Sequence, residues 1–449
     1  MEHKTPIASP HPFIIRPHRT LIGLSLPVLI SLTAEPITGL VDTAFISSLG
    51  VTPLAALGVG TTALSSLFWM FNFLGVGTQT EIAQSYGKGD PKTGNKTLSL
   101  ALLLAVGFGT LLILFLGPTA SWLAGLLGAS GGVQTAAVSY IKIRLFGAPA
   151  VLLTLVSFGA LRGRQDMKTP LLIALGVNIL NLILDWLLIF GRGPFPVMAV
   201  EGSALASTIS QWLGAIASIL LVGKKLGLSK DIAFRDAGPL LSIGGDMFVR
   251  TGLLNIFLAY TTRAANQIGA DAGAAHQVIR QMWIFTALAL DAFAAAVQSL
   301  VGYFVGQKDL AEAKKVTRVA FTWNVGTGLF LGLLMWFCKT WVVDLWVPAT
   351  STVLFLSAWG VSAVSQPLNS IAFLTDGVHW GTGDFSYIRN AMIIASITGL
   401  AGLWLMERAG TTTLFWIWIW IGIWIFLRGL FGTLRIWPGI GKSIFKESK

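Results

Sequence analysis

Long apolar segments are the feature that most limits what this chain can fold into. Twelve such segments, each of about 20 residues or more, run through the 449 residues, and a helix of that length crosses the hydrocarbon core of a bilayer. Only 11% of the residues are charged and 54% are hydrophobic, whereas a soluble domain carries roughly 25% charged residues. The composition therefore excludes a soluble fold and predicts an all-α integral membrane protein with twelve transmembrane helices. The predicted spans are 21–48, 54–82, 97–117, 134–161, 170–191, 199–223, 240–267, 274–304, 316–346, 352–378, 386–407 and 411–434.

The second half of the chain repeats the first. Gly50, Gln79, Gly87 and Asp90 recur as Gly269, Gln298, Gly306 and Asp309, each 219 residues later, and "GALRGRQD" at 159–166 recurs as "GVHWGTGD" at 377–384. Each copy holds six spans, so both copies enter the membrane in the same direction. Parallel repeats of this kind are typical of secondary transporters. We expect an N-lobe over 21–223 and a C-lobe over 240–435 around a central cleft, joined by a polar linker at 224–239.

The basic residues predict the orientation. Most of the 31 Lys and Arg residues fall on one side if loops alternate from the N-terminus, and the side rich in Lys and Arg is cytoplasmic. The segment 1–20 lacks the apolar core of a secretory signal. We therefore expect a cytoplasmic arm at 1–20, a cytoplasmic basic tail at 436–449 and a multi-pass protein of the plasma (inner) membrane. The scattered charge forms no run or aromatic-basic groove, so nucleic acid is not an expected partner despite the net charge of +11.

Polar side chains form one stripe on each of three N-lobe spans. The spacing i, i+3/i+4, i+7/i+8 places residues on one helical face, and a polar face is costly against lipid. The stripes predict either an interior polar pocket or hydrogen bonds that pack the helices together. The stripe residues are Glu35, Thr38 and Asp42; Asn178, Asn181 and Asp185; and Ser203, Ser207 and Gln211.

Asp42 and Asp185 stand out among these residues. No Lys or Arg occurs in the first, fifth or sixth span, and a buried carboxyl group without a cation is held in its neutral form more easily. Such a pair suits a proton relay, or a site that takes Na⁺ in place of the proton. For Glu35 a hydrated surface position is an equal alternative.

The second lobe leaves two interpretations open. Asp291 and Asp376 lie on apolar spans, together with Gln298 and with Gln366 and Asn369, respectively. Because Arg250, Arg263 and Arg280 occur in neighbouring spans, structural ion pairs are as good an explanation as a second polar site. Pro27 and Pro36 interrupt the hydrogen bonding of the first span, which gives either a fixed kink or a bend that changes during function.

The chain contains no sequence motif for a metal, a nucleotide or a catalytic nucleophile. The single Cys338 forms no internal disulfide, and "GKS" at 441–443 lacks the upstream glycine of a phosphate-binding loop. We expect no cofactor and no enzymatic activity. The expected partners are small organic compounds and the bilayer, and we expect a monomer.

Several segments resemble the multidrug and toxic compound extrusion (MATE) family, and most of all its DNA-damage-inducible-protein-F-like branch. They are "LVDTAFISSLGVTPLAALG", "GVGTQTEIAQSYGKGD", "GALRGRQDMKTP", "LDAFAAAVQSLVGYFVGQKD" and "DGVHWGTGDFSYIRNAM". The resemblance covers about 20 to 435. It implies two six-helix lobes and export of organic, often cationic, compounds in exchange for H⁺ or Na⁺.

The resemblance also implies a coupling site in the N-lobe. The residues that match it are Asp42, Asn181, Asp185 and Ser203, where the family has threonine in place of the serine, and the bending proline matches Pro27. Glu35, Asn178, Gln211, Asp291 and Asp376 remain candidates for a substrate site or a second polar site. A proton is the expected coupling ion, with Na⁺ as the alternative. Two other functions stay open: a flippase for lipid-linked precursors, and a membrane-embedded enzyme.

Overall fold

The computed structural model describes residues 10–446, except the side chain of Phe234, and the regular structure of this part is entirely helical. Every predicted span coincides with one helix or with two successive helices. The helices are α1 (Pro12–Ile15), α2 (Pro17–Ser47), α3 (Val51–Met70), α4 (Phe73–Gly87), α5 (Pro91–Leu126), α6 (Gly131–Leu145), α7 (Ala148–Gly163), α8 (Lys168–Ile189), α9 (Ala199–Lys225), η1 (Phe234–Ala237), α10 (Gly238–Ile268), α11 (Ala270–Gly306), α12 (Leu310–Phe337), α13 (Lys339–Trp346), η2 (Ala349–Ser351), α14 (Thr352–Val364), α15 (Gln366–Thr382), α16 (Phe385–Ala409) and α17 (Leu414–Ile436).

Some predicted spans are single long apolar helices, and others are divided into two shorter helices. Within residues 10–446, ten helical segments are long and apolar enough to cross a membrane, and α6 with α7, bent by 48°, makes an eleventh. The predicted span 352–378 corresponds to α14 and α15, with only Ser365 between them. It does not qualify because neither helix is long enough alone, α14 having 13 residues and α15 having 17. The predicted span 316–346 is also divided, since α12 ends at Phe337 and α13 is a separate short helix.

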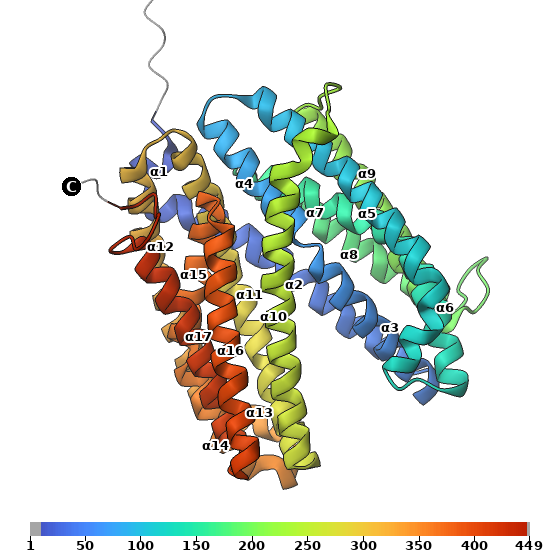
Figure 1. The fold of residues 1–449 in the computed structure, drawn as a ribbon. Coiled ribbons are helices and arrows are strands. Elements are labelled where there is room, and N and C mark those ends of the chain that lie inside the picture. The colour runs from blue at the N-terminus through green and yellow to red at the C-terminus, as the bar shows by residue number, and fades with distance from the viewer. Residues whose placement is uncertain (1–9, 447–449) are drawn as a thin grey trace, which may run out of the picture.

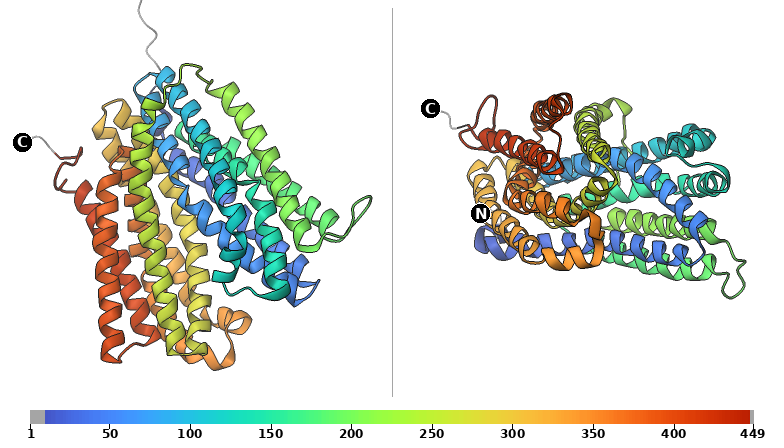
Figure 2. Two further views of the ribbon diagram at one scale, coloured as in Figure 1. Left: turned by 45° about the vertical axis from the view of Figure 1, so that its right-hand side comes forward. Right: turned by 90° about the horizontal axis from the view of Figure 1, so that it is seen from below.

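The helices form two bundles. One contains α2 to α9 and the other α10 to α17, as predicted for an N-lobe and a C-lobe (Figure 1). The bundles approach each other at the end where the described chain begins and ends, here called the terminal end. They diverge toward the opposite end, where α13 and α6 lie (Figures 1 and 2).

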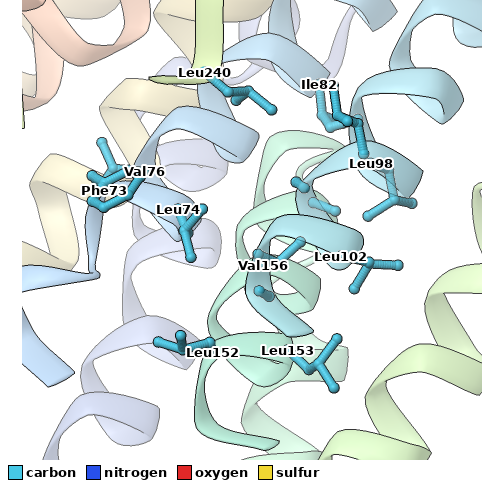
Figure 3. Packing of buried hydrophobic residues seen from close by; sticks show 14 of the residues in the cluster. Phe73, Leu74, Val76, Ile82, Leu98, Leu102, Leu152, Leu153, Val156 and Leu240 are labelled. Carbon is cyan, nitrogen blue, oxygen red and sulfur yellow. The ribbon is translucent and has the colours of Figure 1, made fainter. Parts of the chain in front are cut away.

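The hydrophobic core at the terminal end crosses from one lobe to the other. Its buried residues come from α4, α5 and α7 of the N-lobe and include Leu240 of α10 in the C-lobe (Figure 3). A second cluster fills the C-lobe around Phe257, Trp359 and Trp424. Apolar packing thus joins the two lobes at the terminal end.

Helix α2 belongs to both lobes. It packs along α11 of the C-lobe and along α8 of the N-lobe. Val28 is buried among Met167, Ala292 and Ala295, at the junction of the two lobes. Pro27 is the neighbour of Val28 and leaves the Gly23 carbonyl without its helical hydrogen bond. Pro36 interrupts α2 in the same way, so Pro27 is the break that lies at the junction of the two lobes.

Two glutamines connect the lobes by reciprocal hydrogen bonds. Gln79 of α4 donates from Nε2 to the Ala295 carbonyl at 2.8 Å and to Ser299 Oγ at 2.9 Å. Its repeat mate Gln298 of α11 donates to the Val76 carbonyl and to Thr80 Oγ1, both at 2.9 Å. The acceptors are themselves 219 residues apart, like the donors. The repeated glutamines therefore form a contact with pseudo-twofold symmetry, in which each lobe binds the other in the same way.

Repeated glycines allow this approach. A Cβ atom on Gly87 would overlap the Tyr303 carbonyl, and one on Gly306 would overlap the Gln84 carbonyl. Tyr303 and Gln84 are also repeat mates. The two helix ends meet backbone to backbone, which only glycine permits.

We expect Gly87→Ala and Gly306→Ala to destabilise the protein by about 1–3 kcal/mol each, the usual cost of overpacking. Gly107→Ala is the matched control, because a Cβ atom on Gly107 in α5 meets no atom within 4 Å. This control should be neutral or slightly stabilising, since alanine favours the helix. Thermal unfolding in detergent, followed by tryptophan fluorescence, measures the difference. Equal melting temperatures for all three variants would contradict the close approach of the lobes.

Candidate functional site

The first and fifth spans bring two carboxyl groups together. Asp42 on α2 and Asp185 on α8 are hydrogen-bonded to each other through their side chains. Asp185 is completely buried, and Asp42 is half-buried. A hydrogen bond between two carboxyl groups requires a proton on one of them, because ionised carboxylates only accept. The pair is therefore an arrangement that can hold a proton between two helices.

Asn181 connects this pair to α9. It lies one helical turn before Asp185, on the same face of α8. With its amide nitrogen facing the carboxyl group, Asn181 donates to Asp185 Oδ2 at 3.3 Å, and its oxygen accepts from the Ser207 hydroxyl at 3.3 Å. Ser203 lies one turn before Ser207 on α9, fully buried, and its hydroxyl has no hydrogen-bond partner among the described residues. The polar faces of α2, α8 and α9 thus meet in one interior region.

A basic side chain that the sequence analysis missed lies near the acid pair. Arg144, at the end of α6, attracts both Asp42 and Asp185 electrostatically. Its Nη1 donates to Gln211 Oε1 of α9 at 2.7 Å. The expectation of an acid pair without a nearby cation was wrong, because it considered only the first, fifth and sixth spans. Arg144 inside the apolar segment 134–161 was the available signal.

The remaining N-lobe candidates lie apart from the acid pair. Glu35 is exposed and has no hydrogen bond or ion pair in the described part of the chain. Asn178 donates to the Ala174 carbonyl of its own helix at 2.8 Å. Gln211 reaches the site only through Arg144. Helical spacing placed Glu35 and Asn178 on the same face as an aspartate and Gln211 on the same face as Ser203, but neighbouring helices cover only part of each face.

The C-lobe holds a second charged cluster. Asp376 of α15 accepts at Oδ2 from Arg250 of α10 and, at 2.9 Å, from Arg428 of α17. All three side chains are buried. Each guanidinium also lies over an aromatic ring, Arg250 over Trp380 at 5.4 Å and Arg428 over Trp424 at 4.6 Å. Asp376 is thus held by two guanidinium groups, and the cluster connects three helices, α10, α15 and α17.

Asp291 has a different environment. It lies on α11 and is attracted by Arg162 of α7 and by Arg250, while Asp376 repels it. Arg162 belongs to the N-lobe, so this charge pair crosses between the lobes. The sequence pointed to Arg250 as a partner in the C-lobe but not to Arg162 or Arg428, because partners on distant helices leave no local pattern.

Comparisons with known proteins agree with this architecture. The family model described as MatE matches residues 27–187 and 247–405, one segment in each lobe. The chain is 31% identical over 410 residues to DNA damage-inducible protein F of Escherichia coli, covering 88% of each protein. It is 30% identical over 427 residues to Protein DETOXIFICATION 44, chloroplastic, of Arabidopsis thaliana, covering 88% of this chain and 80% of the relative. It is 24% identical over 329 residues to the probable multidrug resistance protein NorM of Thermotoga maritima, covering 70% of each.

Solved structures share the fold. A crystal structure titled MATE in the bent conformation superposes with a TM-score of 0.85 at 21% identity, covering 93% of this chain and 95% of that one. The structure titled MATE in the straight conformation gives 0.84 at 21% identity, with 93% and 96% covered. These matches confirm the predicted two-lobe fold and the expectation of a transporter. The repeat, the two lobes and the match of both to the family model show that this chain belongs to the multidrug and toxic compound extrusion (MATE) family of membrane efflux transporters.

Proposed function

We propose that this transporter is a proton-coupled antiporter of the inner membrane, with both termini in the cytoplasm. It exports organic compounds, often cations, by alternating access and in exchange for protons. The observation that carries this proposal is the hydrogen-bonded pair of Asp42 and Asp185. A carboxyl pair that shares a proton changes its charge by one when the proton leaves, at a buried place where charge is costly.

Proton binding at this pair would act on helix packing. When both carboxyl groups are ionised, they repel each other, and α2 and α8 are held together less well. When a proton returns, the hydrogen bond between Asp42 and Asp185 forms again. Arg144 moderates the repulsion without removing it, because its guanidinium is also engaged by Gln211. A deprotonated pair also attracts a cationic substrate, so substrate and proton exclude each other by charge.

Helix α2 would carry this change to the other lobe. Its later part, with Asp42, meets α8, and its earlier part packs on α11 around Val28, next to Pro27. The solved structures of similar fold are titled with bent and straight conformations, and in this chain Pro27 is a place where α2 can bend. Protonation from outside would bend α2 at Pro27, reduce the N-lobe pocket and release the substrate outward.

Transport in liposomes tests the coupling assignment. With an imposed pH gradient, we expect wild type to drive efflux of a cationic dye, and Asp42→Asn and Asp185→Asn to fall to the level of protein-free liposomes. Asp344→Asn on α13 is the control, because Asp344 is exposed and forms no ion pair within residues 10–446. Transport by both asparagine variants at the wild-type rate would refute the assignment.

Two further arms of the same assay separate the alternatives. A Na⁺ gradient alone should not drive dye efflux; if it does, Na⁺ is the coupling ion. The variant Glu35→Gln tests whether Glu35 takes part in transport. Because Glu35 is exposed and unpaired in the described part of the chain, we expect no loss of transport.

Alternating access requires the contact between Gln79 and Gln298 to open. Replacing both with alanine leaves buried acceptors unsatisfied at about 1–3 kcal/mol for each side chain. The loss destabilises the form in which the terminal end is closed. It therefore shifts the population toward the form in which this end is open, by about tenfold or more. Spin labels at Lys88→Cys and Lys308→Cys, in a Cys338→Ser background, should report longer distances in the double variant.

Gln134→Ala is the control for this measurement. Gln134 bonds only to Ser121 of its own lobe, at 3.1 Å and 3.3 Å, so its loss should leave the distances unchanged. An unchanged distance distribution in the Gln79→Ala/Gln298→Ala variant would show that the glutamines do not hold this end closed.

We propose a structural role for the C-lobe cluster. Asp376→Ala leaves Arg250 and Arg428 buried without their carboxylate, which typically costs about 3–5 kcal/mol. The exposed Asp344→Ala should change thermal stability little. The triple variant Arg250→Met/Asp376→Leu/Arg428→Met should recover most of the loss, because it removes all three charges together. A fully stable Asp376→Ala protein would instead favour a role in transport.

A further inference from the structure

A long apolar groove lies on the C-lobe, separate from both charged clusters. It has a volume of about 790 Å³ and is bordered by α12, α14 and α17. Its lining includes Trp336, Leu356, Val364, Phe415, Gly422 and Phe426. Phe426 and Val364 are 45% and 69% exposed, so the groove opens outward to the surroundings of the helices. In a membrane-spanning bundle these surroundings are lipid.

No polar side chain that lines the groove is free to bind a ligand. The two serines that line it, Ser357 and Ser365, donate to the carbonyls of Leu354 and Ser362 in their own helix, at 2.7 Å and 2.8 Å. A charged or hydrogen-bonding ligand body would lose its hydration there without compensation. The occupant must therefore be a hydrocarbon.

The length of the groove matches one leaflet. On α17 the lining extends from Phe415 to Phe426, which at 1.5 Å per residue is about 16 Å. The hydrocarbon core of a bilayer is about 30 Å thick, so the groove covers about half of it. Phe415 is the second residue of α17, so the groove starts at the opposite end of the bundle and runs to mid-membrane.

The mouth of the groove carries features of a membrane interface. Trp336, at its edge, lies under the ammonium group of Lys339, 5.5 Å from the ring centroid. Lys339 opens the short helix α13, which buries none of its residues and exposes Trp341 and Trp346. Tryptophan is enriched at membrane interfaces, and lysine attracts anionic lipid headgroups. Lys339 forms no ion pair with a described carboxylate, while the nearby acid of α13, Asp344, is exposed.

From these observations we propose that the groove is a binding site for one anionic phospholipid of the leaflet at the opposite end. An acyl chain lies between α14 and α17, and the phosphate lies beside Lys339. The site is distinct from the coupling site and does not depend on the proposed antiport. Its occupation would fill the space between α14 and α17 that the protein itself leaves open.

Two glycines make the site directly testable. A Cβ atom on Gly422 meets nothing within 4 Å, so Gly422→Leu fills the groove without a clash. Gly326→Leu on α12 is the matched control, because Gly326 is also helical and open but does not line the groove. Val364→Trp fills the groove from α14 and provides a second, independent variant.

The experiment is native mass spectrometry of the delipidated, purified protein titrated with phosphatidylglycerol or phosphatidylcholine of equal acyl chains. We expect one phosphatidylglycerol to bind wild type and Gly326→Leu more tightly than the following ones. Both groove-filling variants should lose this first binding step by about tenfold or more, or 1.4 kcal/mol. Lys339→Gln should keep the step but lose the preference for phosphatidylglycerol.

Three results would overturn the proposal. One is an unchanged first binding step in both filling variants. Another is an equal loss in Gly326→Leu, which would indicate general lipid coating. The third is loss of dye binding in Gly422→Leu with lipid binding intact, which would assign the groove to transported compounds.

Discussion

The reciprocal contact of Gln79 and Gln298 is the interaction on which the arrangement of the two lobes depends. Each amide reaches across to a backbone carbonyl and a hydroxyl of the other lobe. Around it, Gly87 and Gly306 let the helix ends approach to backbone contact. The hydrogen bonds are well satisfied but few, and each is worth only about 1 kcal/mol net. Such a contact specifies one arrangement of the two lobes and is still weak enough for the lobes to separate at this end.

The proposed coupling residue Asp42 lies on a helix that contacts both lobes. Helix α2 lies partly on α11 and partly on α8, and Asp42 lies on the part that meets α8. A buried carboxyl pair responds strongly to one proton, because both the charge and the hydrogen bond change with it. The C-lobe cluster is built differently: Asp376 has two arginine partners, so its charge is already compensated.

Much of the fold was predictable because the membrane imposes simple rules. Apolar length predicted the helices, the internal spacing of 219 predicted the lobes, and helical periodicity placed Asn181 and Asp185 on one face of their helix. The limits of the same reasoning are visible in Arg144 and Glu35. Periodicity assigns a residue to a face of its own helix, but it does not say which helix covers that face. Arg144 therefore entered the site unexpectedly, and Glu35 remained exposed.

By itself, the sequence determined the membrane class, the helical fold and the two parallel copies, because these follow from hydropathy and repetition along one dimension. It also determined which acids are costly in a membrane. Only the tertiary structure decided which helices meet. It brought Asp42 to Asp185, placed two arginines around Asp376, and set Gln79 and Gln298 across from each other's lobes. Contacts between helices depend on crossing angles and on close packing at glycine, and neither can be read from one helix alone.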